Sequence, residues 1–328
     1  MNNSHNTKPL SDDKIKKKVA RLQTTRTICF RLMGLLFLIA GISFFFFMAC
    51  TSLINEESSG FTGFVSGMLC LLCYWFAFMC RNKIRIVISE SLLPDILSEK
   101  FAHVIYNPKR CISKRLIKSV KLVDHGILGR YIRGNNHFLG LYKGRKVEFS
   151  NILISRDSGG VEPGTRGPTF IDFAGPWIIC DFGKHFLKRI RIRERKNLAV
   201  DSVDFTYRSV VENPVKKDKS NFETGNAEFN KRFQILANDP QSAFYVLTPE
   251  FMSRIVRAAD ASRGQLLLCF EGNRVHIAIN TGGDTFEVTE AEHEMADFDK
   301  LRARFRREIQ HLTEVIDIIC EGDGLIRR

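Results

Sequence analysis

Two uncharged apolar segments near the N-terminus constrain this chain more than any other feature of its sequence. Residues 32–54 form a run of 23 residues, and residues 61–80 a run of 20 residues, without Asp, Glu, Lys or Arg. As helices they would measure roughly 34 and 30 Å, against about 30 Å for the hydrocarbon core of a bilayer. Soluble helices seldom extend this far without a charge. The sequence therefore predicts a two-helix transmembrane hairpin rather than a buried helical hairpin of a soluble core.

The charges beside these segments predict the orientation of the hairpin. Residues 1–31 contain eight Lys and Arg against two Asp, and Arg81, Lys83 and Arg85 follow the second segment. The connecting loop, residues 55–60, contains two Glu and no basic residue. By the positive-inside rule both ends of the hairpin face the cytoplasm. We therefore expect a multi-pass membrane protein whose N- and C-termini are cytoplasmic.

Residues 1–31 are predicted to form a basic cytosolic leader with an amphipathic helix that lies on the membrane. Each Lys or Arg near an anionic leaflet gains about 1 kcal/mol, and Ser11 followed by Asp12 and Asp13 suits the start of a helix. The whole chain has a formal net charge of +13, which could also attract nucleic acid. No nucleic-acid recognition motif accompanies this charge. Membrane lipid is therefore an expected partner and nucleic acid is not.

The nine cysteines are scattered and do not predict a disulfide framework. Cys70 and Cys73 form a CxxC inside the second apolar segment, where cysteine usually serves as a small apolar residue. We expect no metal and no cofactor. Gly63 and Gly67 form a GxxxG in the same segment, a spacing that lets transmembrane helices approach closely. Pairing between copies of the chain, a homo-oligomer, therefore stays open.

Residues 81–328 have the pattern of a cytosolic α+β domain with a mainly antiparallel sheet and packed helices. An apolar stripe at helical spacing predicts a helix over residues 89–106. Residues 137–142 and 145–154 predict a hairpin with a Lys143-Gly144 turn and an irregularity near Ser150 and Asn151.

Two polar segments are predicted to be loops, residues 156–168 and residues 208–225. The first is rich in Gly and Pro but lacks the Gly-Lys-Ser/Thr step of a phosphate-binding loop. Between the loops, residues 169–186 predict two strands divided at Gly175-Pro176, and residues 187–196 predict a third.

The last third of the chain predicts two helices around a hairpin. Thr248, Pro249 and Glu250 suit the start of a helix that ends near Ala261. Residues 265–270 and 274–279, joined by a turn with Gly272, predict the clearest hairpin of the chain. A capping box at Thr289 and a long apolar stripe predict a C-terminal helix that packs on the sheet, with an intermolecular coiled coil as the alternative.

One row of charges is a candidate binding surface. Alternation along the strand that begins at residue 187 places four arginines on one face: Arg189, Arg191, Arg193 and Arg195. Such a row could bind phosphate, an anionic lipid headgroup or an acidic protein surface. The alternative is a solvated, charged edge that discourages aggregation.

Several sequence blocks resemble the bacterial family known as domain of unknown function 3137. The upstream blocks are Phe173-Ala174-Gly175 and the segment 181–186, DFGKHF. The downstream blocks are the segments 228–233, 239–243 and 245–252 and the hairpin at 266–279. The residues that carry the resemblance, without an assigned role, are Phe173, Gly175, Asp181, Phe182, Lys184, Phe229, Phe233, Asp239, Thr248 and Pro249.

The resemblance implies an inner-membrane protein with a cytosolic α+β domain, and it implies no activity. We therefore expect a non-catalytic binding or scaffold module at the bacterial inner membrane, with a protein or an anionic headgroup as its partner. The alternative is a membrane-tethered hydrolase or transferase that uses Asp181 and His185 as an acid/base pair. Nucleophile-elbow, phosphate-loop and dinucleotide motifs are absent from the sequence, so no catalytic residue is predicted with them.

Overall fold

The computed structural model describes most of the chain after residue 82. The described ranges are 83–123, 130–157, 169–195, 221–237, 239–287 and 298–321, with scattered residues within 17–35 and 68–79. The predicted spans 32–54 and 61–80 lie almost wholly outside the described residues, as do loop 55–60 and most of the loops predicted at 156–168 and 208–225. In the described ranges, no helix combines the length and the apolar character needed to cross a membrane.

The chain divides into two compact units, residues 1–95 with 288–301 and residues 96–287 with 302–328. In the first unit the described residues between 17 and 35 are helical, and the hydroxyls of Thr24 and Thr25 donate to carbonyls four residues earlier. A helix over residues 83–98 begins in this unit.

The helix predicted over residues 89–106 is displaced. The observed helix occupies residues 83–98, and strand β1 (Ala102–Asn107) follows it. β1 pairs with the strand that contains Leu139 and Leu141, a partner more than thirty residues away along the chain. Residues 102–106 were predicted as helix but form a strand, because β1 pairs with a distant segment. Local apolar spacing contains no information about such a partner.

The second unit is built on a mainly antiparallel sheet, as predicted. Its other described strands are β2 (Arg130–Tyr142), β3 (Arg145–Asp157), β4 (Thr169–Glu194), β5 (Asn221–Phe222), β6 (Phe233–Ala237) and β7 (Gln265–Asn280). The order is β1-β2-β3-β4-β6-β5, and β7 also pairs with β4. Every pairing between these strands is antiparallel. The α+β class expected from the sequence is confirmed.

The β2–β3 hairpin is confirmed, with its turn at Lys143 and Gly144. The irregularity that was predicted near Ser150 and Asn151 lies on the neighbouring strand. The register between β2 and β3 shifts between Asn135 and Phe138, and Asn136 has a positive φ of 52°. The extra residue therefore lies in β2, opposite the predicted position.

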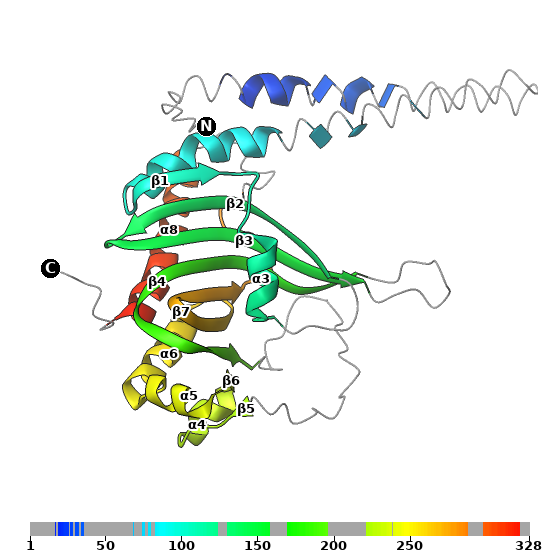
Figure 1. The fold of residues 1–328 in the computed structure, drawn as a ribbon. Coiled ribbons are helices and arrows are strands. Elements are labelled where there is room, and N and C mark those ends of the chain that lie inside the picture. Colours follow the sequence, from blue (N-terminus) through cyan, green and yellow to red (C-terminus); the bar gives the residue numbers. More distant parts are fainter. Residues whose placement is uncertain are drawn as a thin grey trace, which may run out of the picture. The chain divides into compact units, whose positions relative to one another are not determined.

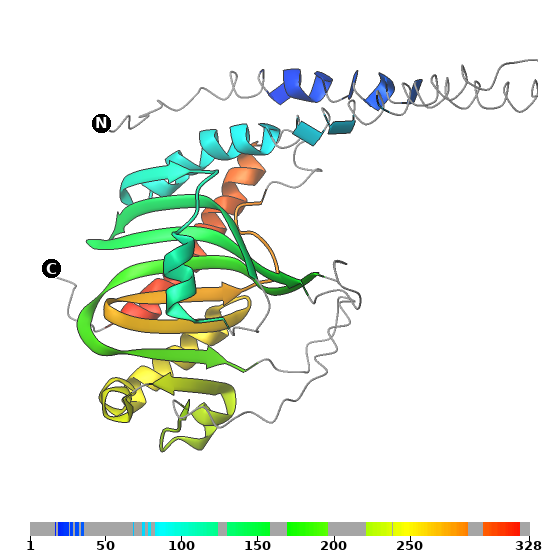
Figure 2. The ribbon, with the colours of Figure 1, turned by 45° about the vertical axis from the view of Figure 1, so that its right-hand side comes forward.

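Strand β4 is one bent strand of 26 residues, so the predicted divisions at Gly175-Pro176 and between residues 186 and 187 are both wrong. Gly175 and Pro176 stay in register with Ile152 and Asn151 of β3. The bend lies further on, where the register with β7 shifts between Asp181 and Ile190. The ribbon shows β4 curving around β7 (Figure 2). The hairpin predicted at residues 265–279 is instead one strand, β7, whose two parts both pair with β4, and Gly272 lies between these parts with a positive φ of 60°.

Helices cover both faces of this sheet. They are α3 (Lys114–Val120), α4 (Ala227–Arg232), α5 (Pro240–Val246), α6 (Pro249–Ala261) and α8 (Phe298–Cys320). α3 and α8 lie on opposite faces (Figure 1). On one face, Ile117 and Val120 of α3 join a buried cluster with Trp177. On the other, Phe305 of α8 packs on Phe286, with ring centroids 5.6 Å apart.

The start predicted for the helix after Thr248 is confirmed in α6. Thr248 caps α6: its Oγ1 accepts a hydrogen bond from Phe251 N at 3.2 Å, and Pro249 is in the first turn, as predicted. The long C-terminal helix is confirmed as α8. The capping box predicted at Thr289 lies outside the described residues.

Four aromatic side chains fill the inside of the β4 bend. The rings of Phe182 and Phe186 lie 5.5 and 5.2 Å from that of Phe270 in β7, and Phe251 of α6 lies 5.5 Å from the same ring. Aromatic pairs at this spacing contribute about 0.5–1.5 kcal/mol beyond their burial. The bend therefore has a packed base that joins β4, β7 and α6.

Gly175 offers a direct test of this arrangement, because β4 approaches the chain at Ile279 too closely for a side chain. A Cβ at position 175 would lie 2.2 Å from Ile279 O and 2.8 Å from Thr281 Oγ1. We expect Gly175→Ala to lower the free energy of unfolding by about 1–3 kcal/mol, since backbone must shift to admit the methyl group.

Urea unfolding followed by tryptophan fluorescence measures this change. Gly225→Ala is the matched control, because nothing lies within 4 Å of a Cβ there. Equal stability of the two variants would contradict the close approach at Gly175.

Candidate functional site

The arginine row predicted on β4 faces helix α3. Arg191 Nη1 and Arg193 Nη2 donate to the carbonyl oxygen of Lys121 at 3.1 and 2.7 Å. Arg189 donates to Ser119 O and forms an ion pair with Glu271. Lys121 is the C-cap residue of α3, in the left-handed conformation with φ 51°.

These contacts stabilise the C-terminus of α3. The last carbonyls of a helix lack partners within the helix and carry partial negative charge. Three guanidinium groups supply donors at the end of α3, and Arg193 is only 8% exposed. Arg195 differs, because it is exposed and donates from Nε to Asn230 O at 3.3 Å. Anion binding by the whole row stays a prediction, and the geometry favours stabilisation of α3 by its first three members.

Arg193→Met and Arg195→Met distinguish the two roles. We expect Arg193→Met to lower the free energy of unfolding by about 1–2 kcal/mol, because the Lys121 carbonyl loses a charged donor in a buried setting. Arg195→Met should change stability by less than about 0.5 kcal/mol, as exposed substitutions usually do. Urea titration of both variants measures the difference, and equal effects would remove the structural role proposed for Arg193.

Most residues that carry the family resemblance are inside the fold. Phe173, Phe182, Phe229 and Phe233 are buried. The rings of Phe229 and Phe233 stack with centroids 4.7 Å apart. These positions therefore support packing rather than contact with a ligand.

The polar members of the motif set hold turns and helix starts. Asp239 accepts from Gln241 N through its side chain at 3.2 Å and from Ala243 N through its carbonyl at 3.2 Å. Thr248 and Pro249 begin α6, and Gly175 permits the close approach described above. Lys184, by contrast, is exposed.

Asp181 and His185 lie at the start of the β4 bend. Asp181 is half-buried and pairs in register with Arg274, while His185 is exposed. The carbonyl of Asp181 accepts from Arg145 Nη1 at 3.4 Å. In the described parts of the chain, no group of three or more His, Cys, Asp and Glu side chains could hold a metal ion. The acid/base pair stays a prediction from sequence, and no contact between the two side chains supports it.

The strongly perturbed titratable groups lie in the interior. Trp177 Nε1 donates to Nδ1 of the buried His276 at 3.3 Å, and burial lowers the pKa of His276 to about 4. Burial raises the pKa of the Cys269 thiol to about 12. The contact with Cys320, whose Sγ is 3.7 Å away, and burial together raise the pKa of the Cys180 thiol. Such thiols are poor nucleophiles, so these groups belong to the core.

His276 predicts a pH dependence of stability. The imidazole stays neutral in the folded protein down to about pH 4, whereas in the unfolded chain it binds a proton below about pH 6.5. The unfolded state therefore binds more protons between these values, and stability is fully present above pH 6.5 and falls as the pH falls. We expect a loss of roughly 3 kcal/mol across this window.

The measurement compares urea unfolding of the wild type and His276→Gln at pH 7 and pH 5. The amide oxygen of Gln can still accept from Trp177, and the variant should lose most of the pH dependence. His311, whose pKa burial also lowers, is present in both proteins and cancels in the comparison. An unchanged pH dependence in the variant would show that His276 is not the responsible group.

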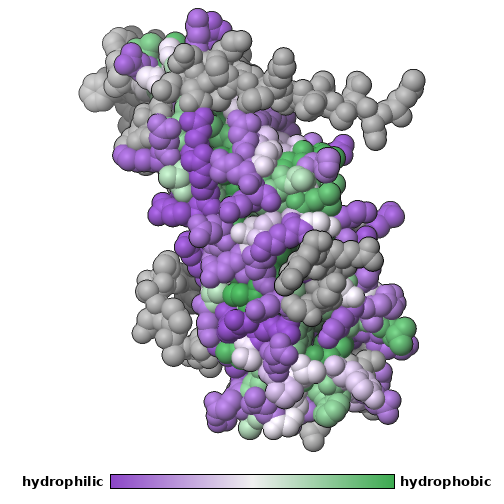
Figure 3. Space-filling model, turned by 90° about the vertical axis from the view of Figure 1, so that its left-hand side faces the viewer, coloured by the Kyte–Doolittle hydropathy of each residue, from purple (hydrophilic) through white to green (hydrophobic). Residues whose placement is uncertain are grey.

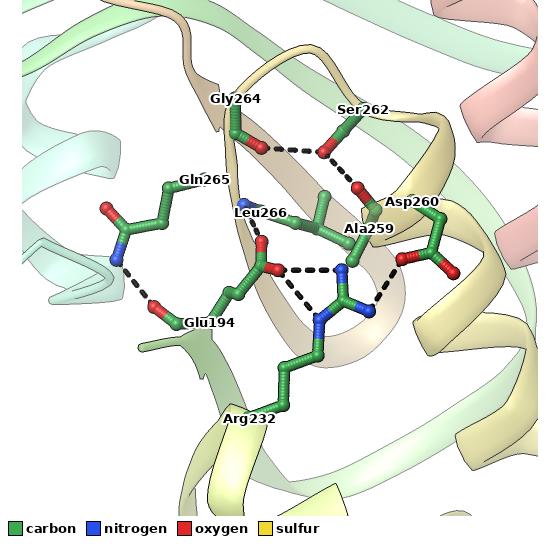
Figure 4. Close-up of polar contacts among 8 residues, drawn as sticks. All are labelled: Glu194, Arg232, Ala259, Asp260, Ser262, Gly264, Gln265 and Leu266. Atoms are coloured by element: carbon green, nitrogen blue, oxygen red, sulfur yellow. Dashed lines mark hydrogen bonds and ion pairs between the residues drawn. The ribbon is translucent and has the colours of Figure 1, made fainter. Parts of the chain in front are cut away.

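A polar network fastens the C-terminal end of β4 to three later elements (Figure 4). Arg232 of α4 donates from Nε to Glu194 Oε1 at 2.9 Å and from Nη1 to Asp260 Oδ1 of α6 at 2.6 Å. The second oxygen of Glu194 accepts from Leu266 N at 3.0 Å, and its carbonyl accepts from Gln265 Nε2 at 2.5 Å. Glu194 thus joins β4 to α4 and to the start of β7, and Arg232 joins α4 to α6.

Two exposed features were missed by the sequence analysis. On α5, Phe244 and Tyr245 are 73% and 81% exposed, although they are adjacent aromatic residues. In the β4 bend, Leu187 is 83% exposed between Lys184 and Lys188, which are also exposed. We call the segment 183–188 the β4 apex. The only sequence signal for the first feature was the adjacent Phe-Tyr pair, and the apex lies across the predicted boundary between the strand that ends at residue 186 and the strand that begins at residue 187.

The fold defines an α+β sheet domain, and the three most exposed large apolar side chains among its described residues lie on α5 and the β4 apex. Residues 171–319 match the family described as "Protein of unknown function (DUF3137)". The resemblance suggested by the sequence is confirmed over this range, which includes the arginine row, the β4 apex and α5.

The crystal structure of the mycobacterial trehalose monomycolate transport factor A, TtfA, is similar to 68% of this chain and 95% of that chain, at 9% sequence identity and a TM-score of 0.31. No curated protein matches the sequence.

Proposed function

We propose that this protein is a membrane-tethered binding module whose cytosolic domain recruits a protein partner through α5. The observation that carries the proposal is the exposure of Phe244 and Tyr245, at 73% and 81%. Aromatic side chains dominate the binding energy of protein interfaces because they bury a large area with little loss of conformational freedom. A neighbouring pair on one short helix provides a compact contact of this kind.

The helix that presents this pair is held from both sides. Ala243 is fully buried beneath it, and Leu247 is buried at its end. Asp239 begins the helix through the Ala243 N–H, and the Thr248 cap joins it directly to α6. Since Glu194 and Arg232 fix the neighbouring α4 and α6, the aromatic pair stands on a rigid support, which lowers the entropic cost of binding.

The tether is the pair of apolar segments at 32–54 and 61–80. The few described residues within them are helical, and large apolar side chains among these are exposed: Leu32, Leu35, Met68, Tyr74, Trp75 and Phe78. Exposed apolar side chains on a helix suit a lipid environment. The positive charges that flank the segments support cytoplasmic termini at a bacterial inner membrane.

Site-specific crosslinking in native membranes tests the partner. A photoreactive phenylalanine analogue at position 244 or 245 should yield one discrete crosslinked product with a second protein, and the analogue at Tyr131 should not. Tyr131 is a matched control because it is an exposed aromatic residue on β2, away from α5.

The double variant Phe244→Ala/Tyr245→Ala completes the test. Co-purification of the crosslinked protein should fall at least tenfold, because two hot-spot residues at about 1–2 kcal/mol each are lost. A product of twice the chain mass would instead show a homo-oligomer. Equal crosslinking from Tyr131 would contradict α5 as the binding surface.

A further inference from the structure

The β4 apex combines charge and apolar surface at the bend of β4. Lys184, His185, Leu187 and Lys188 are exposed, while Phe186 between them is buried. Among the large apolar side chains of the described residues, Leu187 has the highest exposed fraction, 83%. Single exposed apolar side chains are ordinary on protein surfaces, so the exposure of Leu187 matters here only together with the two exposed lysines beside it.

The apex is rigid. Phe182 and Phe186 point into the aromatic cluster with Phe251 and Phe270, so the backbone on both sides of Lys184 and His185 is held. Ring centroids of Phe182 and Phe186 are 5.5 Å apart. The exposed side chains therefore project from a fixed base.

The charge of the apex is positive. Segment 183–188 contains no Asp or Glu. The nearest acidic residues in the register each have a basic neighbour: Asp181 pairs with Arg274, and Glu271 forms an ion pair with Arg189. Figure 3 looks onto the side of the sheet where β4 bends and shows mainly hydrophilic surface with small separate hydrophobic areas. The apex thus presents one apolar side chain between cations.

We infer that the β4 apex docks onto the anionic surface of the bilayer in which the chain is tethered. Leu187 would enter the interfacial region, and Lys184 and Lys188 would extend their ammonium groups to lipid phosphates. A single leucine flanked by lysines on a convex bend fits a flat anionic surface. Hot spots of protein interfaces are enriched in Trp, Tyr and Arg, and segment 183–188 contains none of these, which favours a lipid surface over a protein partner.

The inference rests on the membrane tether proposed above. A tether makes the apex contact an intramolecular step, so an individually weak contact becomes populated. The arginine row contributes little, because its first three members are already bonded to α3 and Glu271. The apex is therefore a separate lipid contact from the headgroup site that the sequence placed on that row.

Hydrogen exchange of the full chain in nanodiscs tests the contact. The chain is reconstituted in discs of phosphatidylcholine alone and of an equal mixture of phosphatidylcholine and phosphatidylglycerol. We expect amide exchange in the segment 182–189 to slow about tenfold in the anionic discs, while the β2–β3 turn at Lys143 and Gly144 stays unchanged. High salt should remove the protection, because exposed charges are screened.

Two variants carry matched charge changes. Lys184→Gln/Leu187→Gln/Lys188→Gln should lose the protection, and Lys109→Gln/Lys114→Gln, which removes two exposed lysines elsewhere, should keep it. Unchanged exchange in β3 and α6 shows that each variant is folded.

The other outcomes overturn the inference. Segment 182–189 could show no protection in either kind of disc, or the same protection in both. Either result excludes an anionic surface as the ligand. Protection that appears only after cytosolic extract is added assigns the apex to a protein. If the chain enters neither kind of disc, the tether fails and the inference fails with it. A chain that enters both kinds of disc without protection of segment 182–189 removes the inference and leaves the tether standing.

Discussion

Strand β4 is the element on which the rest of the domain depends. Its first part pairs with β3, its last part pairs with β6, and β7 pairs with both parts. β4 bends between these parts, and the bend is packed because Phe182 and Phe186 bury their rings against Phe270 and Phe251. The same packing turns the intervening residues outward. The exposed β4 apex is thus a consequence of how the sheet is closed around β7.

Arginine side chains complete the ends of two helices on this frame. Arg191 and Arg193 donate to the C-cap carbonyl of α3, and Arg145 donates from Nη2 to Cys320 O, at the last residue of α8, at 3.4 Å. Helix C-termini attract cations because their free carbonyls carry partial negative charge. A basic composition therefore serves the interior of this domain as well as its surface, and net charge alone overstates what is available to a partner.

Local signals predicted local structure well. The Thr248 cap, the Lys143-Gly144 turn and the long apolar stripe of α8 each depend on residues within a few positions of one another. Gly175-Pro176 was misread for the same reason. The glycine permits a close approach to Ile279, more than one hundred residues away, and does not end a strand. The match of residues 171–319 to the family fits the motif blocks, whose buried aromatics are packing positions.

For the candidate surfaces too, the sequence predicted local features and missed those that depend on distant segments. The period-2 alternation of Arg189 to Arg195 was readable from the sequence, because strand geometry fixes which side chains share a face. The sequence did not reveal that α3 covers this face, since α3 ends about fifty residues before β4 begins and contacts it only in the folded domain. The exposure of Leu187, Phe244 and Tyr245 was equally hidden, because burial depends on distant neighbours rather than on residue type.

By itself the sequence determined the α+β class, the apolar segments at 32–54 and 61–80, the family blocks and several caps and turns, all of which follow from composition or short-range periodicity. Only the tertiary structure decided where β4 bends, which arginines donate hydrogen bonds to helix C-termini and which side chains stay exposed. The physical reason is that strand pairing and burial depend on contacts between segments that are distant in the sequence. Local sequence patterns do not specify those contacts.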